Sequence, residues 1–275
     1  MSEEFTTLSV TESQGVARVT FDNPPVNLCD PAMIADFRRL LDRFATSRDT
    51  RVVVFSSAHP DFFIGHADLN LFLDPVDQIP PKPTKLGPLQ TLFEDLRTLP
   101  QATIGVLEGR ASGAGTEFLT SCDMVFAARG RALLSQFEVA VGVLPGATGS
   151  QRLPRLLGRS RALEMILGCD EFDAELAERY GLVNRALPAA ELWPFVNRLA
   201  ARIATFPAAA IALNKVAVDA SELPIQMGLL EETHTLHQTL VGGEAQRRMR
   251  LLLELGAQEE EFEREQFTAA LERLG

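Results

Sequence analysis

Short apolar runs bounded by turn residues are the main pattern in the first half of the chain. Two of them, Thr6–Val10 and Val16–Phe21, are separated by Gln14-Gly15, which predicts a β-hairpin. A third run, Arg51–Ser57, has an unbroken apolar centre, as is typical of a strand buried on both faces. We expect further strands over Thr103–Leu107, Met124–Ala127 and Leu133–Ser135.

Helical patterns lie between these runs. Pro31–Ala45 repeats apolar residues at helical spacing, and Asp30 stands where an N-cap residue is expected. Leu89–Leu99 predicts a second helix, which ends at Pro100. Thr116–Ser121 predicts a third, which follows a glycine-dense stretch. Because strands and helices alternate, we predict an α/β fold of βαβ units with a mainly parallel sheet.

The pattern becomes almost entirely helical after about residue 151. We expect helices over Arg159–Gly168, Ala174–Tyr180, Ala189–Thr205, Pro207–Ala220, Ile225–Leu240 and Glu244–Leu255. Only Leu182–Ala186 indicates another strand, and the acidic run Glu259–Glu265 indicates a solvated helix face. Asp74–Pro88 is rich in Pro and Lys and lacks a period, which predicts a mobile surface segment.

Composition narrows the class of protein. The 275 residues are 46% hydrophobic and 23% charged, as in globular domains, and 26 Lys and Arg against 37 Asp and Glu give a net charge of −11. That excess of acid argues against a nucleic-acid partner. The three cysteines do not make a disulfide framework, and neither a secretory signal nor a membrane-spanning run is evident. We therefore expect a cytoplasmic protein without a membrane partner.

Three segments carry candidate chemistry. In the first, residues 62–69 follow a buried strand, where open α/β sheets bind ligands, and Gly65 would let a ligand oxygen approach its backbone N–H. A plain turn is the other interpretation. The second, Gly109–Glu117, follows the strand ending at Leu107 and opens a helix, but Phe118 occupies the place of the last glycine of a dinucleotide motif. What remains is a helix N-terminus that favours an anionic oxygen, with Glu117 one turn inside.

The third segment contains Glu138, which precedes the apolar run Val139–Leu144. A carboxyl group in apolar surroundings has a raised pKa and can hold a proton near neutrality. An exposed glutamate on a loop is the alternative interpretation, just as Glu117 could serve only to complement its helix dipole.

Together these segments resemble the crotonase (enoyl-CoA hydratase/isomerase) superfamily. Asn23–Asn27 is similar to its N-P-P-x-N turn, and Phe63–Leu69 to its F-x-A-G-A-D-L segment. Gly109–Asp123 is similar to G-x-A-x-G-G-G-x-E…C-D, and Gln136–Gly149 to Q-P-E…G…P-G-x-G. The four segments occur in the order and at the spacing of the family, so the resemblance spans about residues 5 to 260.

The resemblance implies a fold, a substrate and an assembly. The fold would be a spiral of ββα units over residues 1–200, followed by a helical region over 201–275 that forms a homotrimer or a dimer of trimers. The substrate would be an acyl-CoA thioester. CoA is then part of the substrate, and the resemblance implies neither a metal nor a separate cofactor.

It also implies roles for individual residues. The backbone N–H groups of Gly65 and Ala114 would form an oxyanion hole for the thioester oxygen. Glu117 would orient and deprotonate water, and Glu138 would protonate the α-carbon of a 2-enoyl thioester. The alternative is that the two carboxyls share or exchange these roles, because close carboxyls titrate as a pair. The remaining substrate-binding positions would be Ile64, His66, Ala67, Asp68, Gly113 and Gly142. Isomerisation, thioester hydrolysis and non-catalytic acyl-CoA binding on the same fold are the alternatives to hydration.

Several residues depart from the family pattern or suggest other chemistry. His66 and Ala114 replace glycines, Phe137 replaces a proline, and Glu108 replaces a common asparagine. His66 could contact the acyl pocket or face solvent. Glu231-x-x-His234, with His237 one turn on, resembles half of a metal site, although surface histidines explain it better. Four basic residues could contact the phosphates of CoA, although a solvated side chain is the default interpretation: Lys82, Lys85, Arg152 and Lys215.

Overall fold

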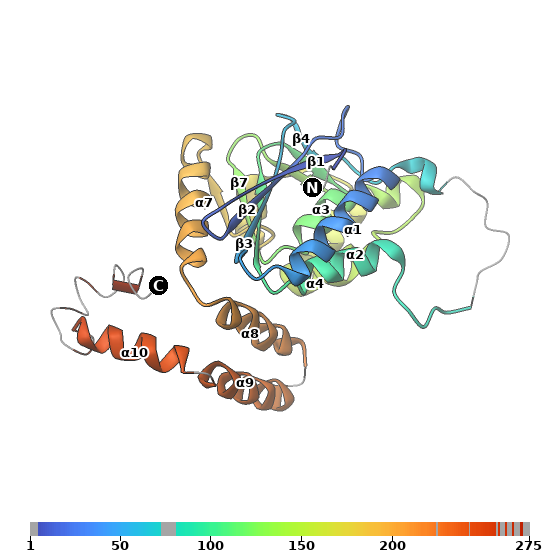
Figure 1. Ribbon diagram of the computed structural model, residues 1–275. Helices are drawn as coiled ribbons and strands as arrows, with labels where there is room; N and C mark the ends of the chain where they lie inside the picture. The colour runs from blue at the N-terminus through green and yellow to red at the C-terminus, as the bar shows by residue number, and fades with distance from the viewer. Residues whose placement is uncertain are drawn as a thin grey trace.

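A six-stranded sheet forms the centre of the protein in the computed structural model (Figure 1). The structure describes residues 5–72, 81–223, 225–241 and 243–256, together with Gln258, Phe262, Gln266, Ala270 and Leu271. The order of the strands is β1 (Leu8–Ser13), β2 (Val16–Phe21), β3 (Val52–Ser57), β5 (Ala102–Leu107), β7 (Met124–Ala128) and β10 (Arg185–Leu187). Only β1 runs antiparallel to its neighbour. The predicted α/β fold with a mainly parallel sheet is confirmed.

The predicted hairpin joins β1 to β2. Gln14 and Gly15 form its turn with φ values of 51° and 78°, which is the positive-φ geometry of a two-residue hairpin loop. Ser13 pairs with Val16 directly beside the turn. β1 begins two residues later and ends three residues later than the sequence suggested, because the turn fixes where pairing can start.

A smaller sheet carries the segments that resemble family motifs. Its order is β4 (Phe62–Ile64), β6 (Arg110–Ser112), β8 (Leu133–Ser135) and β9 (Phe172–Asp173). β8 was predicted, whereas β4, β6 and β9 were missed. β4 and β6 pair in parallel, which brings the chain after residue 64 beside the chain after residue 112.

Helices α1 (Pro31–Thr46), α2 (Pro88–Arg97) and α3 (Ala114–Leu119) pack on one side of the large sheet. Asp30 caps α1 as predicted, since its carboxylate accepts the Met33 N–H at 2.8 Å. Phe118 of α3 lies at the centre of an aromatic cluster, with ring centroids 5.1–5.7 Å from those of Phe21, Phe37, Phe55 and Phe63. This packing fixes α3, and therefore Glu117, against the core.

The other face of the sheet is covered by α7 (Ala189–Ala204), whose Leu192, Val196 and Ala200 are buried against Val54 and Phe126. The Trp193 indole N–H donates to Glu108 at 2.9 Å, so this departure from the family pattern serves packing. The remaining core helices are α4 (Gly149–Leu157), α5 (Arg159–Gly168) and α6 (Ala174–Tyr180), and their buried Leu153, Ala162 and Ala174 belong to the same core cluster as α1 to α3. Of these, α4 was not predicted.

The C-terminal helices α8 (Ala208–Asp219), α9 (Ile225–Leu240) and α10 (Glu244–Glu254) form a layer beside the core (Figure 1). Lys215 of α8 reaches the core, where its Nζ lies 2.8 Å from the Asp123 carboxylate and 2.8 Å from the Gln101 carbonyl oxygen. Lys215 is therefore not a free cation for a CoA phosphate, which corrects that expectation.

The other two candidate lysines, Lys82 and Lys85, are exposed. Residues 73–80 and most of Glu259–Glu265 lie outside the described residues.

The described residues also form three short 3₁₀ helices, η1 (Leu69–Phe72), η2 (Glu138–Val141) and η3 (Ala220–Glu222). No single helix in the described ranges is long and apolar enough to cross a membrane. By length and composition alone, α7 passes that test together with the stretch Ala208–Glu222, but the two are bent by 107° at their junction.

Candidate active site

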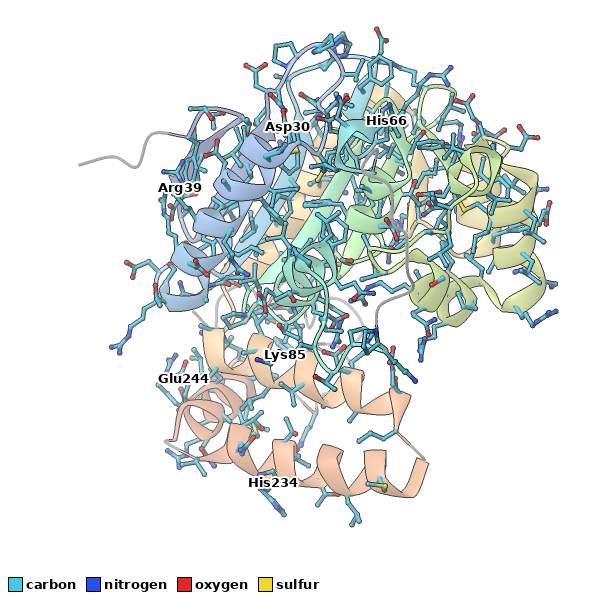
Figure 2. The ribbon with its side chains drawn as sticks, turned by 90° about the vertical axis from the view of Figure 1, so that its right-hand side faces the viewer. Asp30, Arg39, His66, Lys85, His234 and Glu244 are labelled. Atoms are coloured by element: carbon cyan, nitrogen blue, oxygen red, sulfur yellow. The ribbon has the colours of Figure 1, made fainter. Side chains whose placement is uncertain are left out.

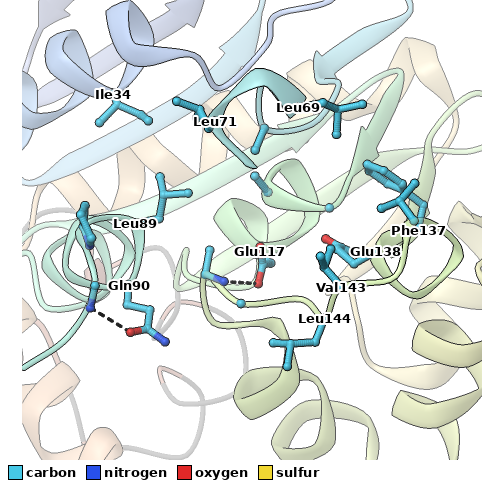
Figure 3. A pocket seen from close by; sticks show the side chains of 18 residues that line it. Ile34, Leu69, Leu71, Leu89, Gln90, Glu117, Phe137, Glu138, Val143 and Leu144 are labelled. Atoms are coloured by element: carbon cyan, nitrogen blue, oxygen red, sulfur yellow. Dashed lines mark hydrogen bonds between the residues drawn. The ribbon is translucent and has the colours of Figure 1, made fainter. Parts of the chain in front are cut away.

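A cavity of about 560 Å³ opens between α1, α2, α3 and the loop around η2 (Figure 3). Its described lining has only three polar side chains, those of Gln90, Glu117 and Glu138. The apolar or glycine part of the lining consists of Ile34, Ala67, Leu69, Leu71, Gly87, Pro88, Leu89, Gly113, Ala114, Phe137, Val141, Val143, Leu144, Gly146 and Ala147. Two acidic groups thus face an otherwise apolar space, which is the usual composition of a small-molecule site.

Glu117 is held by the N-terminus of α4. It is 2% exposed, and its Oε1 accepts three backbone hydrogen bonds, from Ala147, Thr148 and Gly149 at 2.9, 2.8 and 2.7 Å (one is drawn in Figure 3). Burial raises the pKa of Glu117, and the three N–H groups oppose that rise because they favour the charged form. The side chain is therefore fixed in one orientation and has donors that stabilise its anion.

Glu138 begins η2 and is only half-buried. Burial, and to a smaller extent the charge of Glu117, raise the pKa of Glu138 to about 7. A group with this pKa exists in both protonation states near neutral pH, which is the condition for general acid–base work. The interpretation of Glu138 as an exposed loop residue is wrong, since the side chain faces the cavity beside Glu117 (Figure 3).

Gln136 holds the carboxylate of Glu138. Its side chain is fully buried, and with its amide nitrogen turned toward Glu138 it donates to both carboxylate oxygens at 2.8 Å. The opposite orientation would bring the amide oxygen against the carboxylate, so the hydrogen-bond network selects this one. Sequence reasoning did not single out Gln136, although it opens the segment that resembles Q-P-E.

The position of the Glu138 carboxylate leaves no room for a side chain at residue 113, which is glycine. Its φ of +52° is a conformation that residues with a side chain rarely adopt, and a Cβ atom there would lie 2.8 Å from Glu138 Oε1. The next residue, Ala114, begins α3 and lines the cavity. Its methyl group is accommodated in place of the family's glycine.

The structure corrects the expectation that the backbone N–H of Gly65 is an oxyanion donor. Its N–H donates to the Val26 carbonyl oxygen at 3.0 Å, and Gly65 is not part of the described cavity lining. A Cβ at this position would meet the same oxygen at 2.8 Å, so glycine is needed for close packing of the chain. Two residues further on, Ala67 lines the cavity, as Ala114 does, and no described residue accepts a hydrogen bond from either N–H.

Cys29 holds the segment that presents Ala67. The Cys29 N–H donates to the His66 carbonyl at 2.8 Å, and the Asp68 N–H donates to the Cys29 carbonyl at 3.2 Å. These two bonds form a parallel bridge in which the N–H of Ala67 faces the other way. His66 Nδ1 lies 2.8 Å from the Ala67 carbonyl oxygen, and its ring lies 5.4 Å from that of Phe137, so the side chain does not simply face solvent.

The other predicted substrate-binding residues are dispersed. Gly113 lines the cavity, but Ile64 is 2% exposed and packs into the core. Asp68 accepts the Asn70 N–H at 3.0 Å at the start of η1, and Gly142 ends η2 with a φ of +83°. Neither lines the cavity. The sequence analysis did not identify the aliphatic residues that line the cavity. The one signal for them in the sequence was the apolar run Val139–Leu144.

The described residues that the sequence suggested as metal ligands or phosphate contacts do not form a site. Within the described residues, no cluster of His, Cys, Asp and Glu could hold a metal ion. His234 and His237 are exposed, and the side chain of Glu231 lies outside the described residues (Figure 2 labels His234). Arg152 is mostly buried and pairs with Glu94, so it is not free for a phosphate.

Comparisons with known proteins identify the family of the chain. The model of the enoyl-CoA hydratase/isomerase family matches residues 11–255. The chain belongs to that family. A Dictyostelium discoideum relative named "Probable enoyl-CoA hydratase, mitochondrial" is 30% identical over 234 residues, which is 84% of this chain and 82% of the relative. This family membership confirms the resemblance deduced from the four motifs.

Solved structures of family members show the same fold. A Streptomyces avermitilis protein provisionally named an enoyl-CoA hydratase is 39% identical, with a TM-score of 0.73 and 98% of both chains covered. The enoyl-CoA hydratase of Bacillus anthracis is 26% identical, with a TM-score of 0.81 over 90% of this chain and 96% of that one. The predicted crotonase-type fold is therefore confirmed, while the trimer and the cytoplasmic location stay predictions.

Proposed function

We propose that the protein hydrates a 2-enoyl-CoA thioester, with Glu117 and Glu138 as the acid–base pair. The observation that carries this proposal is that both carboxylates face one apolar cavity, in environments that suit different roles. Glu117 has three N–H donors that stabilise its anion, whereas Glu138 has a pKa raised to about 7. Hydration needs one group that takes a proton and one that gives a proton.

The thioester oxygen would accept hydrogen bonds from the N–H groups of Ala67 and Ala114. Both line the cavity, and no described residue uses either donor. Fixed backbone donors stabilise the negative charge that develops on this oxygen, and one such donor contributes on the order of 3 kcal/mol to lowering the barrier. Ala67 takes the place that the sequence suggested for Gly65.

The reaction then follows from the positions of these groups. Glu117 removes a proton from water as the water oxygen forms a bond to C3 of the enoyl group. The electron pair of the double bond moves through C2 to the thioester oxygen, which Ala67 and Ala114 stabilise. Protonated Glu138 gives its proton to C2 as the enolate collapses back to the thioester. The product is a 3-hydroxyacyl-CoA, and proton exchange with solvent restores the two carboxyl groups.

Glu117→Gln and Glu138→Gln test the assignment. We expect each to lower kcat for 2-enoyl-CoA hydration by about 10²- to 10⁴-fold, because each removes one proton-transfer group while keeping its shape. Glu164→Gln, on the exposed side of α5, is the control and should leave kcat unchanged. Unchanged turnover in both site variants would disprove the proposal.

The products distinguish hydration from the other reactions of this fold. Mass spectrometry of the reaction mixture should show the mass of one water added to the thioester. An isomerase would leave the mass unchanged, and a thioester hydrolase would release free CoA. A binding protein without activity would change none of the thioesters while still retaining them in an equilibrium binding assay.

A further inference from the structure

The cavity extends well beyond the two carboxylates. In Figure 3, Glu117 lies between Phe137 and Glu138 on one side and Leu89, Gln90 and Ile34 on the other. The wall beyond Glu117 is aliphatic. Its one polar side chain among the described residues is Gln90, whose Oε1 accepts the Gly87 N–H at 3.0 Å at the start of α2. A group bound in this part of the cavity therefore meets almost no hydrogen-bond partners.

Five aliphatic side chains of the cavity lining are unusually exposed, and in Figure 3 Leu69, Val143 and Leu144 lie on the same side of Glu117 as Glu138. The exposed fractions are 47% for Leu69, 43% for Leu71, 55% for Val141, 51% for Val143 and 63% for Leu144. An apolar group that covers them would be stabilised in proportion to the area removed from water. Because they line the same cavity as Glu117 and Glu138, the group that covers them would be bound together with the reacting thioester.

The size of the cavity also argues for a large acyl group. A methylene occupies roughly the volume of a water molecule, about 30 Å³, so a four-carbon acyl group would fill only about a fifth of the 560 Å³. The space can hold an acyl chain of about ten carbons together with part of the pantetheine arm.

We propose that the acyl group of the substrate is an unsubstituted aliphatic chain of about eight to twelve carbons, covered by Leu69, Leu71, Val143 and Leu144. Its tail would lie against Leu89 and Ile34, at α2 and α1. This inference rests on the proposed function for the identity of the thioester head, but not for the character of the chain.

The chain-length dependence of kcat/KM tests the inference directly. With 2-enoyl-CoA thioesters of four to twelve carbons, we expect kcat/KM to rise about two- to fourfold for each added methylene until the cavity is full. The total increase between four and ten carbons should be at least about 60-fold. An equal or higher kcat/KM for the four-carbon substrate would overturn the inference.

A matched pair of variants locates the chain. Leu144→Ser changes an exposed leucine in the cavity wall, and Leu167→Ser changes an equally exposed one, at 61%, on α5 outside the described lining. Leu144→Ser should lower kcat/KM about tenfold more for the ten-carbon substrate than for the four-carbon substrate, and Leu167→Ser should change neither value. Equal losses for both chain lengths would place the acyl chain elsewhere and overturn the inference.

Binding of saturated thioesters separates this inference from the proposed function. Isothermal titration calorimetry with butanoyl-CoA and decanoyl-CoA requires no turnover. We expect decanoyl-CoA to bind at least about 60-fold more tightly, even if no enoyl thioester is hydrated, in which case only the proposed function fails. Equal affinities would overturn the inference. So would a loss of self-association in Leu144→Ser without any chain-length effect, because another copy of the chain would then cover the wall.

Discussion

At the scale of residues, two glutamates have different surroundings although they face the same space. Three backbone N–H groups surround one oxygen of Glu117, while the main partner of Glu138 is the amide of Gln136. The difference lies in the fixed donors around each carboxylate. The backbone donors oppose the rise that burial causes in the pKa of Glu117, and burial raises the pKa of Glu138 to about 7.

Glu138 should set the pH dependence of the reaction. Its pKa is raised to about 7, and the protonated form supplies the proton to C2, so kcat/KM should fall as the pH rises through about 7. A pH profile from 5 to 9 measures this. A flat profile above pH 7 would show that Glu138 does not act as the acid.

The same pKa predicts the sign of a stability change. The folded protein binds the Glu138 proton more tightly than the unfolded chain, whose pKa is near 4.5. Wild type should therefore lose stability relative to Glu138→Gln as the pH rises from about 4.5 through about 7. Urea denaturation of both proteins across this range gives the difference. A constant difference would mean that the pKa in the folded protein is not raised.

Gly113→Ala should disturb Glu138, and Gly130→Ala supplies the control. Both glycines have a positive φ, +52° and +73°, so both variants should lose about 1 kcal/mol of stability. Only at Gly113 would the added Cβ meet Glu138 Oε1, at 2.8 Å, whereas nothing lies within 4 Å at Gly130. We expect kcat to fall at least about tenfold in Gly113→Ala alone. Equal kcat values in the two variants would contradict this.

At the scale of elements, short strands and helix starts build the site. β4 and β6 pair in parallel and lead into the segments that present Ala67 and Ala114. The start of α4 supplies the donors for Glu117, and the start of α1 follows Cys29, which holds the Ala67 segment. The site thus depends on the places where elements begin, since free backbone N–H groups are found there.

Two N-cap residues allow this dependence to be measured. Asp30 caps α1 beside Cys29, and Asp173, which is not part of the described cavity lining, caps α6 by accepting the Leu176 N–H at 2.7 Å. Asp30→Ala and Asp173→Ala should each cost about 1 kcal/mol of stability, which thermal denaturation will show. Only Asp30→Ala should also lower kcat, because it loosens the chain that holds Ala67. A normal kcat in Asp30→Ala would disprove this coupling.

At the scale of the whole molecule, the C-terminal helices are tied to the core by charge. Lys215 contacts Asp123, and Arg97 pairs with Asp219 at 2.6 Å. The same helices expose large apolar side chains, among them Val218 at 69%, Met227 at 56% and Leu230 at 68%. Apolar surface of this kind is typical of a region that contacts another protein chain.

The predicted homotrimer, or dimer of trimers, can be measured by analytical ultracentrifugation. Wild type should sediment with three or six times the mass of one chain. Leu230→Glu should shift the protein toward the monomer, because a charge at an apolar interface must be desolvated. Leu167→Glu on α5 is the control for an equally exposed leucine and should leave the assembly intact. A monomeric wild type would contradict the prediction.

The sequence by itself determined the longer strands, most of the helices and the two carboxylates, whereas α4 and the short strands β4, β6 and β9 were missed. Strands such as β3 and helices such as α1 follow from hydrophobic spacing, because burial of one face imposes a period on the residues. Glu117 and Glu138 could be identified because the motifs around them are local in sequence. The excess of acid that argued against a nucleic-acid partner is likewise a property of composition.

Only the tertiary structure decided which groups meet. Whether the N–H of Gly65 or that of Ala67 is free depends on Val26 and Cys29, which lie more than 35 residues earlier in the chain. Lys215 and Arg152 are paired with acids on other elements, and the aliphatic wall combines residues from α1, α2, η1 and the chain after η2. These contacts join segments distant in sequence, so no local pattern records them.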